Sequence, residues 1–110
     1  MNEELIQMLL AFREERNWGQ FHNPKDLAIS LSLEASELLE NFQWKSSEES
    51  VSQKRQDIAD ELADVLIYSI YLADVLDLDV EGIIRDKMRR NGAKYPVDKS
   101  FGKMTKYNEL

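Results

Sequence analysis

The stretch D-E-L-A-D-V-L-I-Y, residues 60–68, combines acidic and apolar side chains at helical spacing. With Ile58 as the reference and about 100° per residue, one apolar stripe is formed by Ile58, Leu62, Val65, Ser69, Leu72 and Leu76. Glu61, Asp64 and Tyr68 fall beside this stripe. Since no Gly or Pro interrupts the surrounding sequence, we predict one long helix over about residues 48–75.

A second stretch, S-L-E-A-S-E-L-L-E at residues 32–40, repeats the combination. Glu34 lies within about 20° of Leu27, so it falls inside an apolar stripe rather than on a solvated face. Glu37 lies three residues later, and residues three apart are neighbours on a helix surface. Two such helices packed face to face would bring two pairs of acids together: Glu34 with Glu37, and Glu61 with Asp64.

Four carboxylates in a place of low dielectric require a partner. The chain has no cysteine, which excludes a thiolate site, and a single histidine, so a metal site here would have little imidazole among its ligands. Hard divalent cations prefer oxygen ligands. We therefore predict that Mg²⁺, or alternatively Mn²⁺, is bound by Glu34, Glu37, Glu61 and Asp64, while Asp57, Asp60 and Glu40 are ordinary surface acids.

The rest of the chain predicts three further helices, over about residues 2–17, 24–41 and 79–90. Asn23 followed by Pro24 is typical of a helix start, and Asn91-Gly92 is typical of a helix end. We expect an all-α fold resembling a four-helix bundle, with residues 1–110 forming a single domain and an irregular C-terminal arm.

The composition excludes several functions. The net charge is −7, from 14 basic and 21 acidic residues, which argues against a nucleic acid polymer as partner. The N-terminal sequence lacks the basic and apolar regions of a signal peptide, and the longest apolar run is too short to cross a bilayer. We expect a cytoplasmic protein with no membrane partner.

A carboxylate-bound Mg²⁺ usually keeps waters and binds substrate phosphates, so the acids favour metal-assisted hydrolysis of a phosphoanhydride. The segments that surround the acids also resemble the all-α MazG-type nucleotide pyrophosphohydrolases, in the small single-domain branch of the dCTP pyrophosphatases. The resemblance is carried by R-N-W-G-Q-F-H-N-P-K-D-L-A, L-E-A-S-E-L-L-E-N-F-Q-W, D-E-L-A-D-V-L-I-Y and K-M-R-R-N-G-A-K-Y-P-V.

This resemblance implies hydrolysis of a nucleoside triphosphate to the monophosphate and pyrophosphate. It also implies that the base and sugar are bound by Trp18, His22, Trp44 and Tyr68, and the phosphates by Asn91, Lys94 and Tyr95. Many relatives have an additional Glu directly before the first acid, where this chain has Leu33. The choice of the carboxylate that activates water therefore stays open among Glu37, Glu61 and Glu40.

Two alternative functions use acidic helices of this kind. A di-iron carboxylate protein needs Glu-x-x-His pairs, and the sequence has none. A non-catalytic helical interaction module with an acidic strip stays open, as does the choice between dCTP and a modified or non-standard nucleotide in house-cleaning. Because Ile67 and Ile70 add apolar surface opposite the Ile58 stripe, we also expect a homodimer or tetramer.

Overall fold

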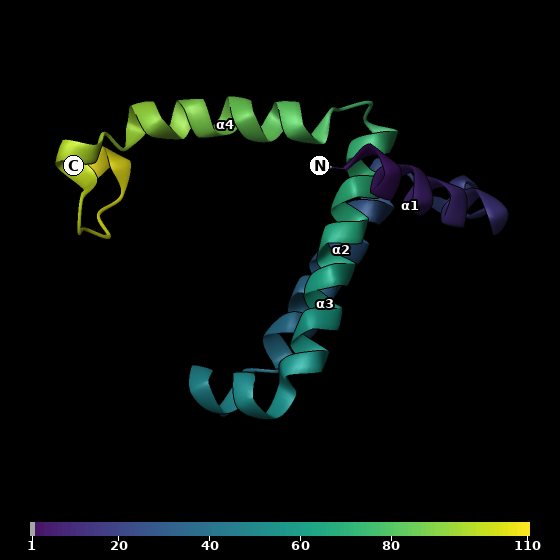
Figure 1. The fold of residues 1–110 in the computed structure, drawn as a ribbon, viewed down its shortest axis with the longest axis horizontal. Helices are drawn as coiled ribbons and strands as arrows, with labels where there is room; N and C mark the ends of the chain where they lie inside the picture. The colour runs from purple at the N-terminus through teal and green to yellow at the C-terminus, as the bar shows by residue number, and fades with distance from the viewer. Residues whose placement is uncertain (1) are drawn as a thin grey trace. The chain divides into compact units, whose positions relative to one another are not determined.

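A computed structural model describes residues 2–110, and all regular elements in that range are helical (Figure 1). In chain order they are α1 (Glu3–Glu15), η1 (Trp18–Phe21), α2 (Pro24–Glu40), α3 (Ser47–Val75), α4 (Val80–Lys94), α5 (Val97–Ser100) and η2 (Tyr107–Glu109). Since residues 2–110 contain no strand, the predicted all-α class is confirmed.

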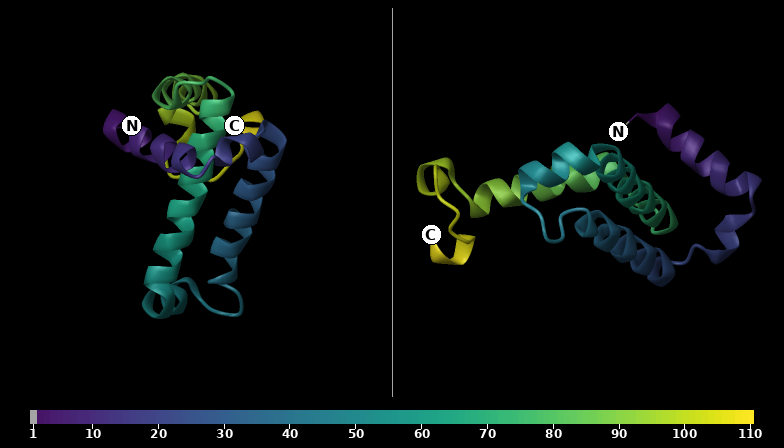
Figure 2. Two further views of the ribbon diagram at one scale, coloured as in Figure 1. Left: turned by 90° about the vertical axis from the view of Figure 1, so that its right-hand side faces the viewer. Right: turned by 90° about the horizontal axis from the view of Figure 1, so that it is seen from below.

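The chain divides into two compact units, one ending at Asp77 and the other formed by Leu78–Leu110. In the first unit, α2 and α3 lie side by side along much of their length, as Figures 1 and 2 both show. The α1 helix is attached to the C-terminal part of α3, where the Tyr71 hydroxyl donates to the Leu9 carbonyl over 2.8 Å. The predicted packing of four helices into one domain stays a prediction.

The helices α2, α3 and α4 each begin at a side chain that caps their first turn. Asn23 Oδ1 accepts a hydrogen bond from the Asp26 backbone N–H over 2.9 Å at the start of α2. Ser46 and Asp79 cap α3 and α4 in the same way. These side chains satisfy N–H groups that have no partner within the helix, which fixes where the acid-bearing helices start.

Some predicted boundaries were wrong. The α1 helix is shorter than residues 2–17, because Asn2 is its cap and the chain leaves the helix after Glu15. The α4 helix continues through Asn91-Gly92 to Lys94, since the Tyr95 N–H still donates to the Asn91 carbonyl over 2.8 Å. A glycine inside a helix costs only about 1 kcal/mol, so it does not have to end one.

Two further differences concern α3 and the C-terminal arm. Lys54 has φ −124° and ψ 24°, so α3 is not helical throughout. Neither Gly nor Pro occurs there to explain the break. The C-terminal arm is also less irregular than expected, because it contains α5 and the short η2.

The buried apolar core among the described residues is small, and it comprises Leu27, Ile70, Tyr71 and Ala73. Large apolar side chains on α2 and α3 are instead exposed, among them Leu33, Leu39, Leu62 and Leu66. No helix within residues 2–110 has both the length and the apolar character needed to cross a membrane.

Candidate active site

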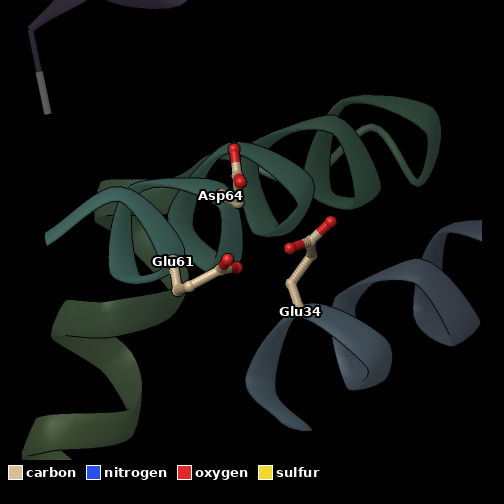
Figure 3. Close-up of side chains that lie close together, drawn as sticks. All are labelled: Glu34, Glu61 and Asp64. Atoms are coloured by element: carbon tan, nitrogen blue, oxygen red, sulfur yellow. The ribbon is translucent and has the colours of Figure 1, made fainter. Parts of the chain in front are cut away.

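Three acids come together where α2 faces α3. Glu34 on α2 and Glu61 and Asp64 on α3 each place one carboxylate oxygen within 4.8 Å of the other two (Figure 3). All three side chains are half-buried. The spacing of three residues puts Glu61 and Asp64 on neighbouring positions of α3, and the side-by-side packing with α2 supplies the third acid.

Within this three-acid cluster, Glu34 and Glu61 hold their protons more tightly than ordinary carboxyls because the pKa of each is raised. Partial burial raises the pKa of Glu34 to about 7, with further contributions from the side chains of Glu37 and Glu61 and the charge of Asp64. Burial and Glu37 also raise the pKa of Glu61, while its interaction with Glu34 acts in the opposite direction. The cluster is therefore electrostatically strained in the absence of a positive charge.

The residues present fit a hard divalent cation. Oε2 of Glu34 and Oε2 of Glu61 are both buried and have no hydrogen-bond partner. An unpaired buried oxygen costs free energy, and a cation would satisfy both oxygens at once. The donor set consists of carboxylate oxygens, which suits Mg²⁺ or Mn²⁺.

Glu37 lies outside the group of three, although it is near enough to raise the pKa of both Glu34 and Glu61. It lines a polar hollow of about 440 Å³ at the C-terminal end of α2. Glu61 lines this hollow too, together with Glu40, Asn41, Lys54, Asp57 and Asp60. Both predicted catalytic acids, Glu37 and Glu61, therefore border one water-accessible space.

An apolar cavity of about 470 Å³ lies between α3 and the α1–η1 segment. Its aromatic lining comprises Phe12, Trp18, His22, Tyr68 and Tyr71. Asp64 also lines this cavity, so the three-acid cluster and the cavity share one residue. A mostly apolar cavity with few polar groups is typical of a small-molecule site.

The aromatic rings are held against one another. Phe12 and Trp18 meet edge to face with centroids 5.7 Å apart, and the Arg16 guanidinium covers Phe12 at 3.6 Å from its centroid. The rings of His22 and Tyr71 lie 5.1 Å apart. Such contacts stabilise ring positions beyond simple burial, so the cavity wall is organised before any ligand binds.

The structure brings together Trp18, His22 and Tyr68 of the predicted substrate residues. Trp44 does not line the cavity; it is 92% exposed in the loop after α2, with a positive φ of 64°. In the second unit, the Lys94 ammonium lies 4.6 Å from the Tyr107 ring centroid.

The other predicted phosphate ligands also belong to the second unit. Tyr95 meets Tyr107 edge to face at 6.1 Å between centroids, and Asn91 is half-buried on α4. The roles assigned to Asn91, Lys94 and Tyr95 stay predictions.

Several residues of the cavity wall were not predicted from the sequence: Met8, Leu9, Ala11, Phe12, Glu15, Ile67 and Tyr71. A signal for Tyr71 was present, because Glu61, Asp64, Tyr68 and Tyr71 are spaced three, four and three apart and share one face of α3. The α1 residues had no such signal, since the contact between α1 and α3 is not encoded by periodicity.

Several known proteins are similar to this chain in sequence. The profile of the MazG-like family matches residues 29–110. The chain is 39% identical to dCTP pyrophosphatase 1 of Rattus norvegicus and 36% identical to that of Homo sapiens, over 113 aligned residues in each case. Both alignments cover 98% of this chain and 66% of the relative, so the chain spans about two thirds of the length of these relatives.

A solved structure shares the fold. The crystal structure of a pyrophosphatase from Archaeoglobus fulgidus superimposes with a TM-score of 0.81 at 43% sequence identity, covering 86% of this chain and 91% of the archaeal one. The family match extends over most of the chain and includes all three acids of the cluster. By its sequence and its fold, this chain belongs to the MazG-like family.

Proposed function

We propose that the protein hydrolyses nucleoside triphosphates to the monophosphate and pyrophosphate in a reaction that depends on Mg²⁺. The observation that carries this proposal is the position of Asp64, which belongs to the three-acid cluster and also lines the aromatic cavity. A nucleotide has a flat apolar base at one end and a charged triphosphate at the other. Adjacent aromatic and acidic subsites match those two ends.

The relatives support the substrate class. Similarity to dCTP pyrophosphatase 1 over nearly the whole chain favours deoxycytidine triphosphate or a modified or non-standard deoxynucleotide, as in house-cleaning of the nucleotide pool. An aromatic wall stacks any base, so the stacking itself gives no preference. We expect the preference to come from the few polar groups of the cavity, among them His22 and Glu15.

We assign Glu34, Glu61 and Asp64 as the residues that would hold Mg²⁺, with Glu37 next to them. The ion would neutralise and orient the phosphate oxygens. The acids that would hold the ion near the phosphates lie on α2 and α3, while Trp18 and Tyr68 hold the base and sugar. In this proposal, the base and the phosphates are bound by different parts of the site.

Water is the nucleophile in the proposed reaction. Glu37, at the polar hollow, accepts a proton from the attacking water, and Glu61 is the second candidate for this role. The water oxygen forms a bond to the α-phosphorus, the bond from that phosphorus to the bridging oxygen of the β-phosphate breaks, and pyrophosphate leaves with the bonding electrons. The products are the nucleoside monophosphate and pyrophosphate.

We further propose that the chain acts as a homodimer or tetramer. Leu62 and Leu66 on α3 are exposed and lie four apart on one face, whereas Ile70 is buried and Ile67 lines the cavity. The apolar surface that favours assembly is therefore not the one identified in the sequence. Contiguous exposed apolar surface commonly marks a protein interface.

A panel assay tests the function. Purified protein is incubated with Mg²⁺ and ribo- and deoxynucleoside triphosphates, including modified cytosines, with separate detection of pyrophosphate and orthophosphate. We expect pyrophosphate release that stops when Mg²⁺ is chelated. Absence of turnover on every triphosphate, together with no effect of Mg²⁺ on the thermal unfolding midpoint, would instead support the non-catalytic interaction module.

A further inference from the structure

Arg13 on α1 is a charged residue that has no role in the three-acid cluster or in the proposed reaction. Its side chain is only 11% exposed, and its Nη2 donates to Asp74 over 2.7 Å. Its Cζ lies 5.4 Å from the ring centroid of Tyr71. The other terminal nitrogen, Nη1, is buried without a hydrogen-bond partner. A buried N–H that lacks an acceptor is costly, which indicates a role beyond the ion pair.

His22 lies on the same tyrosine. Its ring centroid is 5.1 Å from that of Tyr71, and it lines the aromatic cavity. Its Nδ1 is buried and also has no partner, so Nε2 is the ring nitrogen that remains available to a ligand. Burial, and then the charge of Arg13, lower the pKa of His22.

Tyr71 holds the two residues in place. Its side chain is buried, and its hydroxyl is engaged with the Leu9 carbonyl. Burial raises the pKa of Tyr71, so the ring that lies near both Arg13 and His22 carries no charge. Both the guanidinium and the imidazole are thereby placed beside one neutral, fixed ring.

We infer that Arg13 is a positioning residue of the base cavity: its buried guanidinium, set against Tyr71, holds His22 as the uncharged ring with Nδ1 as acceptor and the proton on Nε2. Nδ1 is buried without an acceptor, and a guanidinium can only donate, so the tautomer with a lone pair on Nδ1 leaves no buried ring N–H unpaired. An uncharged imidazole lets a neutral nucleobase cover it without burying a charge, which would be costly. This role rests on the proposed function.

The other ionisable groups near His22 come from the same two helices. Glu15 on α1 and Asp64 and Tyr68 on α3 line the cavity with it. Since η1 contributes no ionisable side chain, the pKa of His22 is lowered first by burial and then by the charge of Arg13.

The single histidine makes the test unambiguous. NMR titration of the imidazole ring measures its midpoint, and nitrogen shifts report which nitrogen carries the proton. In wild type we expect the proton on Nε2 and a midpoint below the usual value of about 6.5. Arg13→Met keeps the length of the side chain and removes its charge, and it should raise the midpoint by roughly 0.5 to 1 pH unit.

Three further variants determine whether charge is the cause. Arg13→Lys keeps the charge and should keep the midpoint low. Asp74→Asn removes the counter-charge of Arg13 and should move the midpoint down, so the inference is still tested if Arg13→Met does not fold. The matched control Arg55→Gln removes an exposed charge elsewhere in the same unit and should leave the midpoint unchanged. An equal midpoint in wild type and folded Arg13→Met would overturn the inference, as would an unshifted or raised midpoint in Asp74→Asn.

The activity readout separates positioning from general damage. The KM of Arg13→Met relative to wild type should be near one at about pH 8 and rise to about threefold at about pH 6, where the variant ring is protonated. The kcat ratio should stay constant. A KM ratio that does not depend on pH would contradict the inference. Lack of turnover by wild type would count against the proposed function alone, since the NMR titration needs no activity.

Discussion

At the scale of single residues, Glu34 differs from an ordinary helix-surface glutamate because it lies in the apolar stripe of α2 beside two other acids. Its pKa is raised to about 7 in the folded state, above the value of about 4.5 for an unperturbed side chain. Between those values the folded state binds more protons than the unfolded state. The stability contributed by this group is therefore full below about pH 4.5 and is lost as the pH rises through about 7.

The raised pKa of Glu34 predicts how the stability of the metal-free protein depends on pH. Urea unfolding in the presence of a chelator should give a lower free energy of unfolding at about pH 8 than at about pH 5.5, and Mg²⁺ should restore much of the difference at the higher pH. In Glu34→Gln the dependence on pH should be weaker, because a neutral amide replaces the titrating carboxyl. If the variant and the wild type have the same pH dependence, the proton is not held by Glu34.

Glu61 is the residue whose loss should be most informative for catalysis. It belongs to the three-acid cluster and also borders the polar hollow. Glu61→Gln should lower kcat by about 100-fold or more, while the helical circular dichroism signal stays unchanged. Glu48→Gln, in the exposed first turn of α3, is the matched control. Wild-type turnover by Glu61→Gln would show that the reaction takes place elsewhere.

At the scale of helices, much of the arrangement followed from local rules. Asn23 before Pro24 was recognisable as the start of α2, and the half-buried position of Glu34 followed from its angle relative to Leu27. The end of α4 did not follow, because Asn91-Gly92 can either end a helix or continue through it. The break at Lys54 has no sequence marker.

The cap of α2 gives a prediction at this scale. Asn23 Oδ1 accepts the Asp26 N–H at the start of the helix that carries Glu34. Asn23→Ala should lower the free energy of unfolding by about 1 kcal/mol, as measured by urea denaturation. Asn108→Ala, where no cap is lost, should have little effect. Equal effects of the two substitutions would mean that this cap does not stabilise α2.

At the scale of the whole molecule, one part of the site could be predicted from the sequence and another part could not. The acids of α2 and α3 were predictable because spacing within each helix determines which face they occupy. The cavity was only partly predictable: Trp18, His22 and Tyr68 belong to it, but its α1 wall, which includes Phe12, depends on how α1 packs against α3. Such long-range packing leaves no periodic signal in one sequence.

Assembly is the second property at this scale. Leu62 and Leu66 are exposed on one face of α3, and a chain with so small a buried core gains stability by covering them. Light scattering at micromolar concentration should show a dimer or tetramer. Leu66→Glu should shift the mass towards the monomer, whereas Gln53→Glu, which adds the same charge at an exposed polar position of α3, should not. A monomeric wild type would refute the proposed assembly.

In the proposed reaction, water attacks the α-phosphorus at a site formed by the three-acid cluster and the adjacent cavity. The most direct measurement is hydrolysis, in water enriched in heavy oxygen, of the triphosphate that the panel assay shows to be turned over fastest, followed by mass spectrometry of both products. We expect one heavy oxygen in the nucleoside monophosphate and none in the pyrophosphate. Heavy oxygen in the pyrophosphate, or orthophosphate as a primary product, would contradict it.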